Sequence, residues 1–81
     1  MIVRVRLFAV AKDLAEAETV TVELAEDATV GQLREALGQQ VPRLAKILRQ
    51  VTFAVDRQYA SDRTPVRAGS EIACIPPVSG G

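Results

Sequence analysis

The sequence predicts an α+β domain in which one main helix packs on one face of a mixed sheet of about five strands. Three observations predict this class. Two segments with alternating apolar and polar residues open the chain, one amphipathic stretch follows, and three short alternating segments close it. The chain has 81 residues, 48% of them hydrophobic, which suits one domain with a small core.

The first two strands are expected at residues 2–8 and 19–24, because apolar and polar residues alternate in both. The alanine-rich residues 9–18 connect them, with a helical turn expected at residues 10–15. The connection is too long for a tight hairpin. An antiparallel pair is still the natural expectation for two consecutive strands.

The main helix is expected to begin after Thr29. Thr29 as N-cap and Gln32 three positions later fit a capping box. The apolar stripe that follows consists of Val30, Leu33, Ala36 and Leu37. Gly38 is the expected stop, and Pro42 is expected to open a second short helix.

Three further strands are expected at residues 51–55, 58–60 and 71–75, with a turn at Asp56 and Arg57. Pro76 and Pro77 end the last strand because proline cannot donate to a ladder. This order of elements is that of the ubiquitin-like β-grasp, which places the first and last strands side by side and parallel at the centre of the sheet. We therefore predict a β-grasp domain at residues 1–75 and a flexible tail, residues 76–81.

The composition excludes several kinds of active site. The chain has no histidine and one cysteine, so catalytic triads and Cys/His zinc sites are excluded. Ten basic residues balance ten acidic ones, which predicts no nucleic-acid or membrane partner. No signal peptide or membrane span is expected, and a single cysteine suits the cytoplasm.

The charges are unevenly distributed along the chain. Residues 1–41 hold seven acids and four bases, and residues 42–81 hold three acids and six bases. The basic second half could face an acidic partner or a phosphate-bearing ligand. Scattered, solvated charges are the simpler interpretation.

The end of the chain, GSEIACIPPVSGG at residues 69–81, resembles the C-terminus of the small subunits of molybdopterin synthase. The segments VRLFAVAKDLA, TVGQLREAL and FAVDRQYA are also similar to that family. Three departures are Asp56 in place of the usual asparagine, Lys12-Asp13 in place of Arg-Glu, and Cys74 at a position that is often aromatic.

The resemblance implies a sulfur carrier of molybdenum cofactor biosynthesis, a non-catalytic subunit in a heterotetrameric sulfurtransferase complex. An adenylyltransferase resembling ubiquitin-activating enzymes would use ATP to adenylate Gly81, and a sulfur donor would convert the adenylate into a thiocarboxylate. The tail would insert into the large catalytic subunit and give sulfur to a cyclic pyranopterin precursor. The resemblance implies no cofactor or metal bound by this chain.

The residue types of the tail suit this role on physical grounds. The tail consists of Pro76, Pro77, Val78, Ser79, Gly80 and Gly81. Glycine places no side chain beside the carbonyl or in a narrow channel. Six extended residues reach about 20 Å, and two prolines stiffen the base of the tail. A disordered end without function is the alternative interpretation.

A docking surface is expected beside the exit of the tail. Alternation places Phe8, Arg4 and Arg6 on the sheet face opposite the helix, with Ile75 near Phe8 if the first and last strands are parallel neighbours. Arg67 is a further candidate for charge complementarity to the partner. Alternation turns Cys74 toward the helix, where a buried thiol is inert.

Three other functions fit the same pattern. The chain could carry sulfur for thiamine, cysteine or tRNA thiolation. It could be a ubiquitin-like modifier joined to lysines, for which Lys12 and Lys46 are possible acceptors. It could also be a binding module with an inert tail.

Overall fold

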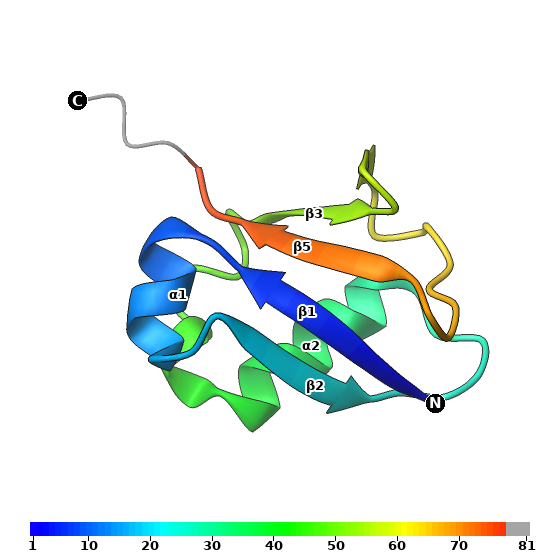
Figure 1. Cartoon of the computed structure of the whole chain (residues 1–81), viewed down its shortest axis with the longest axis horizontal. Coiled ribbons are helices and arrows are strands. Elements are labelled where there is room, and N and C mark those ends of the chain that lie inside the picture. Colours follow the sequence, from blue (N-terminus) through cyan, green and yellow to red (C-terminus); the bar gives the residue numbers. More distant parts are fainter. Residues whose placement is uncertain (78–81) are drawn as a thin grey trace.

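A five-stranded mixed sheet with a long helix across one face forms the body of the protein (Figure 1). The computed structural model describes residues 1–77. The elements in chain order are β1 (Ile2–Leu7), α1 (Ala9–Ala15), β2 (Thr19–Glu23), α2 (Val30–Gln40), the 3₁₀ helix η1 (Pro42–Leu44), β3 (Thr52–Val55), β4 (Gln58–Ala60) and β5 (Glu71–Ile75). The predicted α+β class and ubiquitin-like fold are confirmed.

The strands lie in the order β2-β1-β5-β3-β4. β1 and β5 are parallel, with Leu7 opposite Cys74, and the other neighbouring strands are antiparallel. The predicted adjacency of the first and last strands is therefore correct. As a result, the strand that leads to the C-terminus is hydrogen-bonded on both sides and lies at the centre of the sheet (Figure 1).

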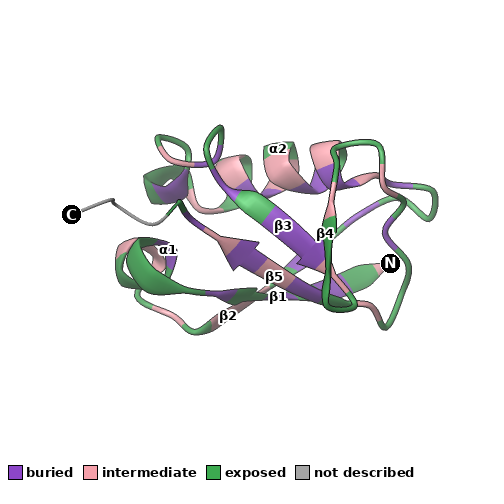
Figure 2. Cartoon of the chain, turned by 90° about the horizontal axis from the view of Figure 1, so that it is seen from above, coloured by how far each residue is buried: buried purple, intermediate pink, exposed green. Residues whose placement is uncertain are grey.

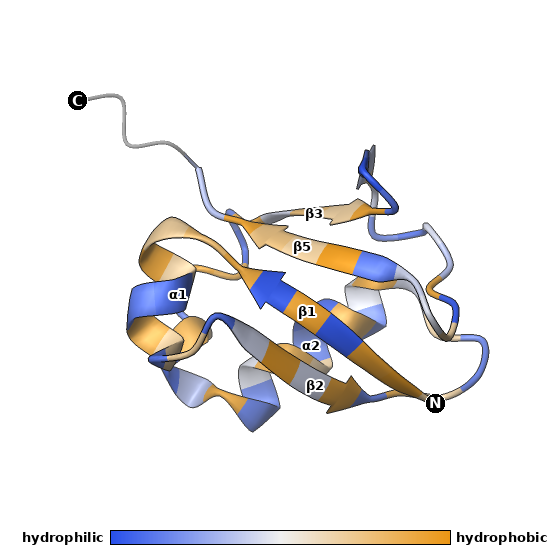
Figure 3. Ribbon diagram, in the orientation of Figure 1, coloured by the Kyte–Doolittle hydropathy of each residue, from blue (hydrophilic) through white to orange (hydrophobic). Residues whose placement is uncertain are grey.

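The core lies between the sheet and α2. Hydrophobic and hydrophilic residues alternate along β1 (Figure 3), so Val3, Val5 and Leu7 are buried while Arg4 and Arg6 are exposed. The buried stripe of α2 consists of Val30, Leu33 and Leu37. Figure 2 shows α2 over one face of the sheet. Within residues 1–77 no helix lies over the opposite face, which we call the outer face.

The start of α2 is the predicted capping box. The Thr29 amide donates to Gln32 Oε1 at 2.8 Å, and the Gln32 amide donates to Thr29 Oγ1 at 3.4 Å. The predicted stop at Gly38 is wrong, because α2 continues to Gln40. A Cβ at Gly38 would lie 3.1 Å from Leu48 Cδ1, so this glycine allows the segment after α2 to pack closely on the helix.

The connection between β1 and β2 is more regular than expected. The predicted helical turn is a seven-residue helix, α1, which packs against η1 and β5 and buries Ala11. It ends where Glu16 adopts a left-handed conformation, with φ at 55°. α1 thereby lies at the end of the sheet where β5 finishes (Figure 1).

The predicted turn between β3 and β4 is confirmed, and it also touches β5. Asp56 and Arg57 both have positive φ angles, 50° and 70°. The Asp56 amide donates to the Glu71 carbonyl at 2.8 Å, and the Glu71 amide donates to Asp56 Oδ1 at 2.9 Å. This pair of hydrogen bonds fixes the start of β5 against the turn.

Candidate functional site: the tail exit and the outer face of the sheet

The tail leaves the body from the end of β5. Pro76 is buried and Pro77 is exposed, so the accessible chain begins at Pro77. This exit lies at the α1 end of the sheet, and Met1 lies at the other end (Figure 1). The other predicted tail residues, Val78, Ser79, Gly80 and Gly81, lie outside the described residues.

Phe8 lies beside the tail exit. Its amide donates to the Cys74 carbonyl at 3.3 Å, and the pairing of Leu7 with Cys74 makes Phe8 and Ile75 the next pair in the register. Phe8 is 40% exposed and Ile75 is half-buried. The structure thus places these two predicted docking residues together, at the point where the chain leaves the sheet.

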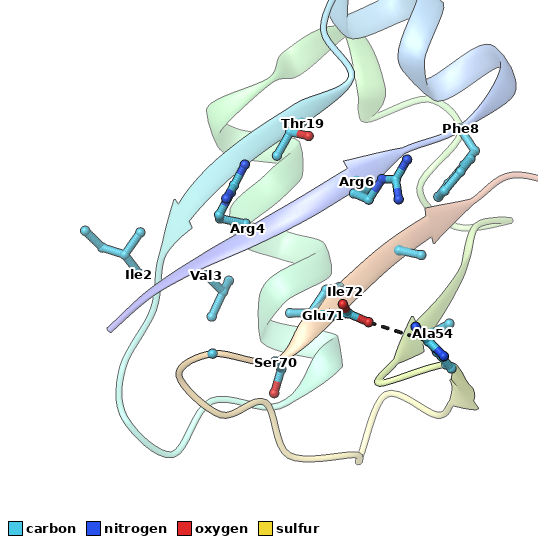
Figure 4. Close-up of a pocket in the computed structure, with 13 residues that line it drawn as sticks. Ile2, Val3, Arg4, Arg6, Phe8, Thr19, Ala54, Ser70, Glu71 and Ile72 are labelled. Atoms are coloured by element: carbon cyan, nitrogen blue, oxygen red, sulfur yellow. Dashed lines mark ion pairs between the residues drawn. The ribbon is translucent and has the colours of Figure 1, made fainter.

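Arg4, Arg6 and Phe8 project from the same face of β1 (Figure 4). The Arg6 guanidinium carbon lies 5.4 Å from the centroid of the Phe8 ring, which is within the range of a cation–π contact. Arg67 is exposed but precedes the start of β5, whereas Phe8 lies beside its end. The structure therefore separates Arg67 from Phe8 and Ile75 by the length of a strand, whereas Arg4, opposite Glu71, lies at the same end of β5 as Arg67.

The outer face is hollowed beside these residues (Figure 4). A cavity of about 670 Å³ is lined by Arg4, Arg6 and Phe8 and also by Ala54 and Ala73. Neither alanine stands out in the sequence. A small residue becomes informative only when the strand order shows that it has a second small residue beside it.

The charges of the outer face are only partly paired. Arg57 and Glu71 lie 3.8 Å apart, and near the tail exit Lys12 lies 3.3 Å from Glu18. Within residues 1–77, neither Arg4 nor Arg6 lies within ion-pair distance of a carboxylate. Two arginines of the central sheet are therefore free to meet charges on another molecule.

Cys74 is fully buried, as predicted from alternation. Burial raises the pKa of its thiol to about 11, and the positive charge of Arg34 opposes this rise. A thiol reacts as its thiolate, so Cys74 is protonated and inert near neutral pH. This environment agrees with the inert, buried thiol expected from alternation.

The described part of the chain offers little other chemistry. Residues 1–77 contain no group of three or more His, Cys, Asp or Glu side chains placed to hold a metal ion. In the same residues no helix is both long and apolar enough to cross a membrane. The distinctive features that remain are the outer face and the exit of the tail.

The strand order and the central strand that leads toward Gly80-Gly81 place this chain in the class of ubiquitin-like β-grasp proteins. The ThiS family model matches residues 5–81, and the chain belongs to this family.

Curated relatives extend over nearly the whole chain. The chain is 37% identical over 81 residues to the molybdopterin synthase sulfur carrier subunit of Caenorhabditis briggsae, covering 98% of this chain and 96% of the relative. It is 33% identical to the protein of that name from Homo sapiens, covering 98% and 93%. The resemblance found in the sequence is confirmed.

Solved structures agree with the fold. Small archaeal modifier protein 1 of Haloferax volcanii superposes with a TM-score of 0.85 at 28% identity, over 95% of this chain and 98% of that one. A chain of the complex between subunits 1 and 2 of the molybdopterin-converting factor of Helicobacter pylori superposes with a TM-score of 0.70 at 29% identity. That match covers 100% of both chains.

Proposed function

We propose that this protein is the sulfur carrier of a molybdopterin synthase in molybdenum cofactor biosynthesis, and that it works in the cytoplasm. The observation that carries the proposal is full-length similarity to proteins named molybdopterin synthase sulfur carrier subunit. The central position of β5 supports it, because the chain leaves the sheet beside an exposed surface. The domain, residues 1–75, serves as the body that presents the tail, residues 76–81.

The chemistry proposed for Gly81 begins with its carboxylate. A carboxylate oxygen attacks the α-phosphorus of ATP in an adenylyltransferase that resembles ubiquitin-activating enzymes, forming an acyl-adenylate and releasing pyrophosphate. A donor then delivers sulfur at the oxidation level of sulfide, which attacks the carbonyl carbon, and AMP leaves. The product is a thiocarboxylate, whose sulfur passes to a cyclic pyranopterin precursor in the large catalytic subunit, while water supplies the oxygen that restores the Gly81 carboxylate. The reaction needs no side chain from this protein, because each partner supplies its own catalytic groups.

The tail and the outer face are proposed to act together in binding. The tail enters the large subunit, and the surface around Phe8 and Ile75 rests on that subunit, with Arg4 and Arg6 pairing with its charges. An exposed aromatic residue beside arginines that have no ion pair in the described part of the chain is a composition common at interfaces. Arg67, which lies farther away, would contribute to a separate part of the contact.

Mass spectrometry of the intact protein tests the carrier function. After incubation with a competent activating enzyme, ATP and a sulfur donor, we expect the mass to rise by the difference between sulfur and oxygen. The same enzyme is first shown to load a known carrier. An unchanged mass in that setting would rule out a sulfur-carrier role.

Recovery of the large synthase subunit with the tagged protein would separate this pathway from thiamine, cysteine or tRNA thiolation.

A ubiquitin-like modifier is the second candidate. The similarity to small archaeal modifier protein 1 favours it, as does the exposed position of Lys46, one possible acceptor. In cells, isopeptide-linked adducts that disappear when Gly81 is deleted would support this role. If no adducts form while the thiocarboxylate does, the carrier function alone remains.

A further inference from the structure

One row of residues crosses the outer face from edge to edge. The pairings of the five strands place in this row Thr19, Arg6, Ala73, Ala54 and Tyr59. The two members on the inner strands β5 and β3 are both alanine, and they lie opposite each other. Two methyl groups thus lie between the larger side chains of Arg6 and Tyr59 in this row, and Arg6, but not Tyr59, lines the cavity on the outer face.

The depression above Ala54 and Ala73, which we call the socket, is part of the cavity on the outer face. Tyr59 stands on the β4 side and is 79% exposed. Arg6 stands on the β1 side, next to Phe8 (Figure 4). An exposed tyrosine and two neighbouring alanines form apolar surface that is in contact with solvent in the isolated domain. A partner could bury this surface on binding.

We propose that the socket receives one bulky apolar side chain of the large synthase subunit, and that a carboxylate beside this side chain pairs with Arg6. The inference rests on the proposed function and specifies the chemistry of the partner surface. The two methyl groups of the floor cannot hydrogen-bond, so an apolar group fills the space best.

Charge complementarity supports the carboxylate. Arg4 lies opposite Glu71 in the register, yet Glu71 forms its ion pair with Arg57. The Arg6 guanidinium lies over the Phe8 ring, and within residues 1–77 it donates no side-chain hydrogen bond. A guanidinium binds carboxylates in a bidentate manner, so two arginines that form no ion pair within residues 1–77 favour an acidic neighbour on the partner.

Filling the socket tests the proposal. Ala73→Leu adds a side chain on the outer face, away from α2, so we expect the fold to persist. The matched control is Thr21→Leu, which adds a leucine to the same face on β2, where Thr21 is exposed and does not line the cavity. Calorimetry should show that Ala73→Leu binds the large subunit at least about tenfold more weakly than wild type, whereas Thr21→Leu binds within about twofold. Equal affinity of Ala73→Leu and wild type would overturn the inference.

Further variants keep the test decisive. If circular dichroism shows that Ala73→Leu is unfolded, Tyr59→Ala takes its place, since removing a highly exposed side chain spares the core. Tyr59→Ala and Arg6→Glu should each weaken binding, and the loss with Arg6→Glu should shrink as salt increases. Unchanged affinity in both would also overturn the proposal.

The wild-type protein separates this inference from the function on which it rests. Wild type that forms a thiocarboxylate and binds the large subunit, while the socket variants bind equally well, contradicts the socket alone. Wild type that neither binds nor is loaded contradicts the proposed function. Self-association of wild type that Ala73→Leu abolishes would assign the socket to a second copy of the chain and overturn the proposal.

Discussion

Arg34 of α2 donates from Nε and Nη2 to the same carboxylate oxygen of Asp62, at 3.2 and 2.9 Å. Its Nη1 also donates to the carbonyl oxygens of Leu48 and Val51, the latter at 2.7 Å. The guanidinium carbon lies 5.0 Å from the centroid of the buried Phe53 ring. One side chain thus joins α2 to the irregular segment before β3 and to the loop after β4.

We expect Arg34→Met to lower the free energy of unfolding by about 2–4 kcal/mol, because the Val51 carbonyl loses its side-chain donor, the Leu48 carbonyl keeps only the Val51 amide, and the ion pair with Asp62 is lost. Urea denaturation followed by circular dichroism measures the change. The control is Arg49→Met, at an exposed arginine for which residues 1–77 show no ion pair or side-chain hydrogen bond. Equal stability of the two variants would show that the Arg34 contacts contribute little.

Asp56→Asn should leave the free energy of unfolding within about 0.5 kcal/mol of wild type. Asparagine tolerates the left-handed conformation, and its amide oxygen can still accept the hydrogen bond from the Glu71 amide. Asp56→Ala should destabilise the protein by about 1–2 kcal/mol, because alanine is less stable in the left-handed conformation and cannot accept the hydrogen bond from the Glu71 amide. Thermal and chemical unfolding of the pair tests this, and the explanation fails if Asn destabilises as much as Ala.

Cys74 should make the protein less stable at alkaline pH. Its pKa is raised from 9.0 to about 11 by burial, so between these values the unfolded chain loses the thiol proton while the folded chain keeps it. Stability contributed by the neutral thiol is therefore complete below about pH 9 and is lost as pH rises toward 11. The loss amounts to about 2–3 kcal/mol.

Cys74→Val is the matched control for this pH dependence. Valine fills a similar volume and cannot ionise, and all other titrating groups are the same in both proteins. As pH rises from 7 to 11, the unfolding free energy of wild type should fall relative to that of Cys74→Val. A constant difference across this range would show that the thiol does not titrate as described.

Deletion of Gly81 should abolish sulfur transfer and leave the domain intact. The described fold is complete by Pro77, so we expect the same unfolding midpoint as wild type, and affinity for the large subunit should fall only modestly. Ser79→Ala is the control that keeps the length of the tail. Transfer of sulfur by the shortened chain, followed by intact mass, would mean that Gly81 is not the carrier residue.

Local sequence patterns were sufficient for most of the fold. Alternation located β1, β2 and β5, since each has one face in the core, and the capping box located the start of α2. The predicted end of α2 was wrong because Gly38 allows close packing of Leu48 on the helix and does not end it. Leu48 lies ten positions away, so a short sequence window does not reveal this contact. The full extent of α1 was also missed, because its packing on β5 and η1 stabilises a helix that its short sequence alone does not.

The candidate site was predictable only as far as alternation reaches. The two-residue repeat of a β-strand predicted that Arg4, Arg6 and Phe8 share one face. The β-grasp strand order, with the first and last strands adjacent, predicted that Ile75 lies beside Phe8. The socket could not be predicted, because it depends on the register of β3 against β5. Arg67 could not be assigned for a related reason: an irregular segment has no periodicity to show where it runs.

The position of β5 has a mechanical consequence. A partner that draws on the chain at Pro77 pulls along β5, which is bonded on one side to β1 and on the other to β3. The load is then shared by both ladders in shear, so many hydrogen bonds must yield together instead of opening one after another. The strand that leads to the C-terminus is therefore held on both sides against extraction, which an edge strand such as β2 or β4 would not be.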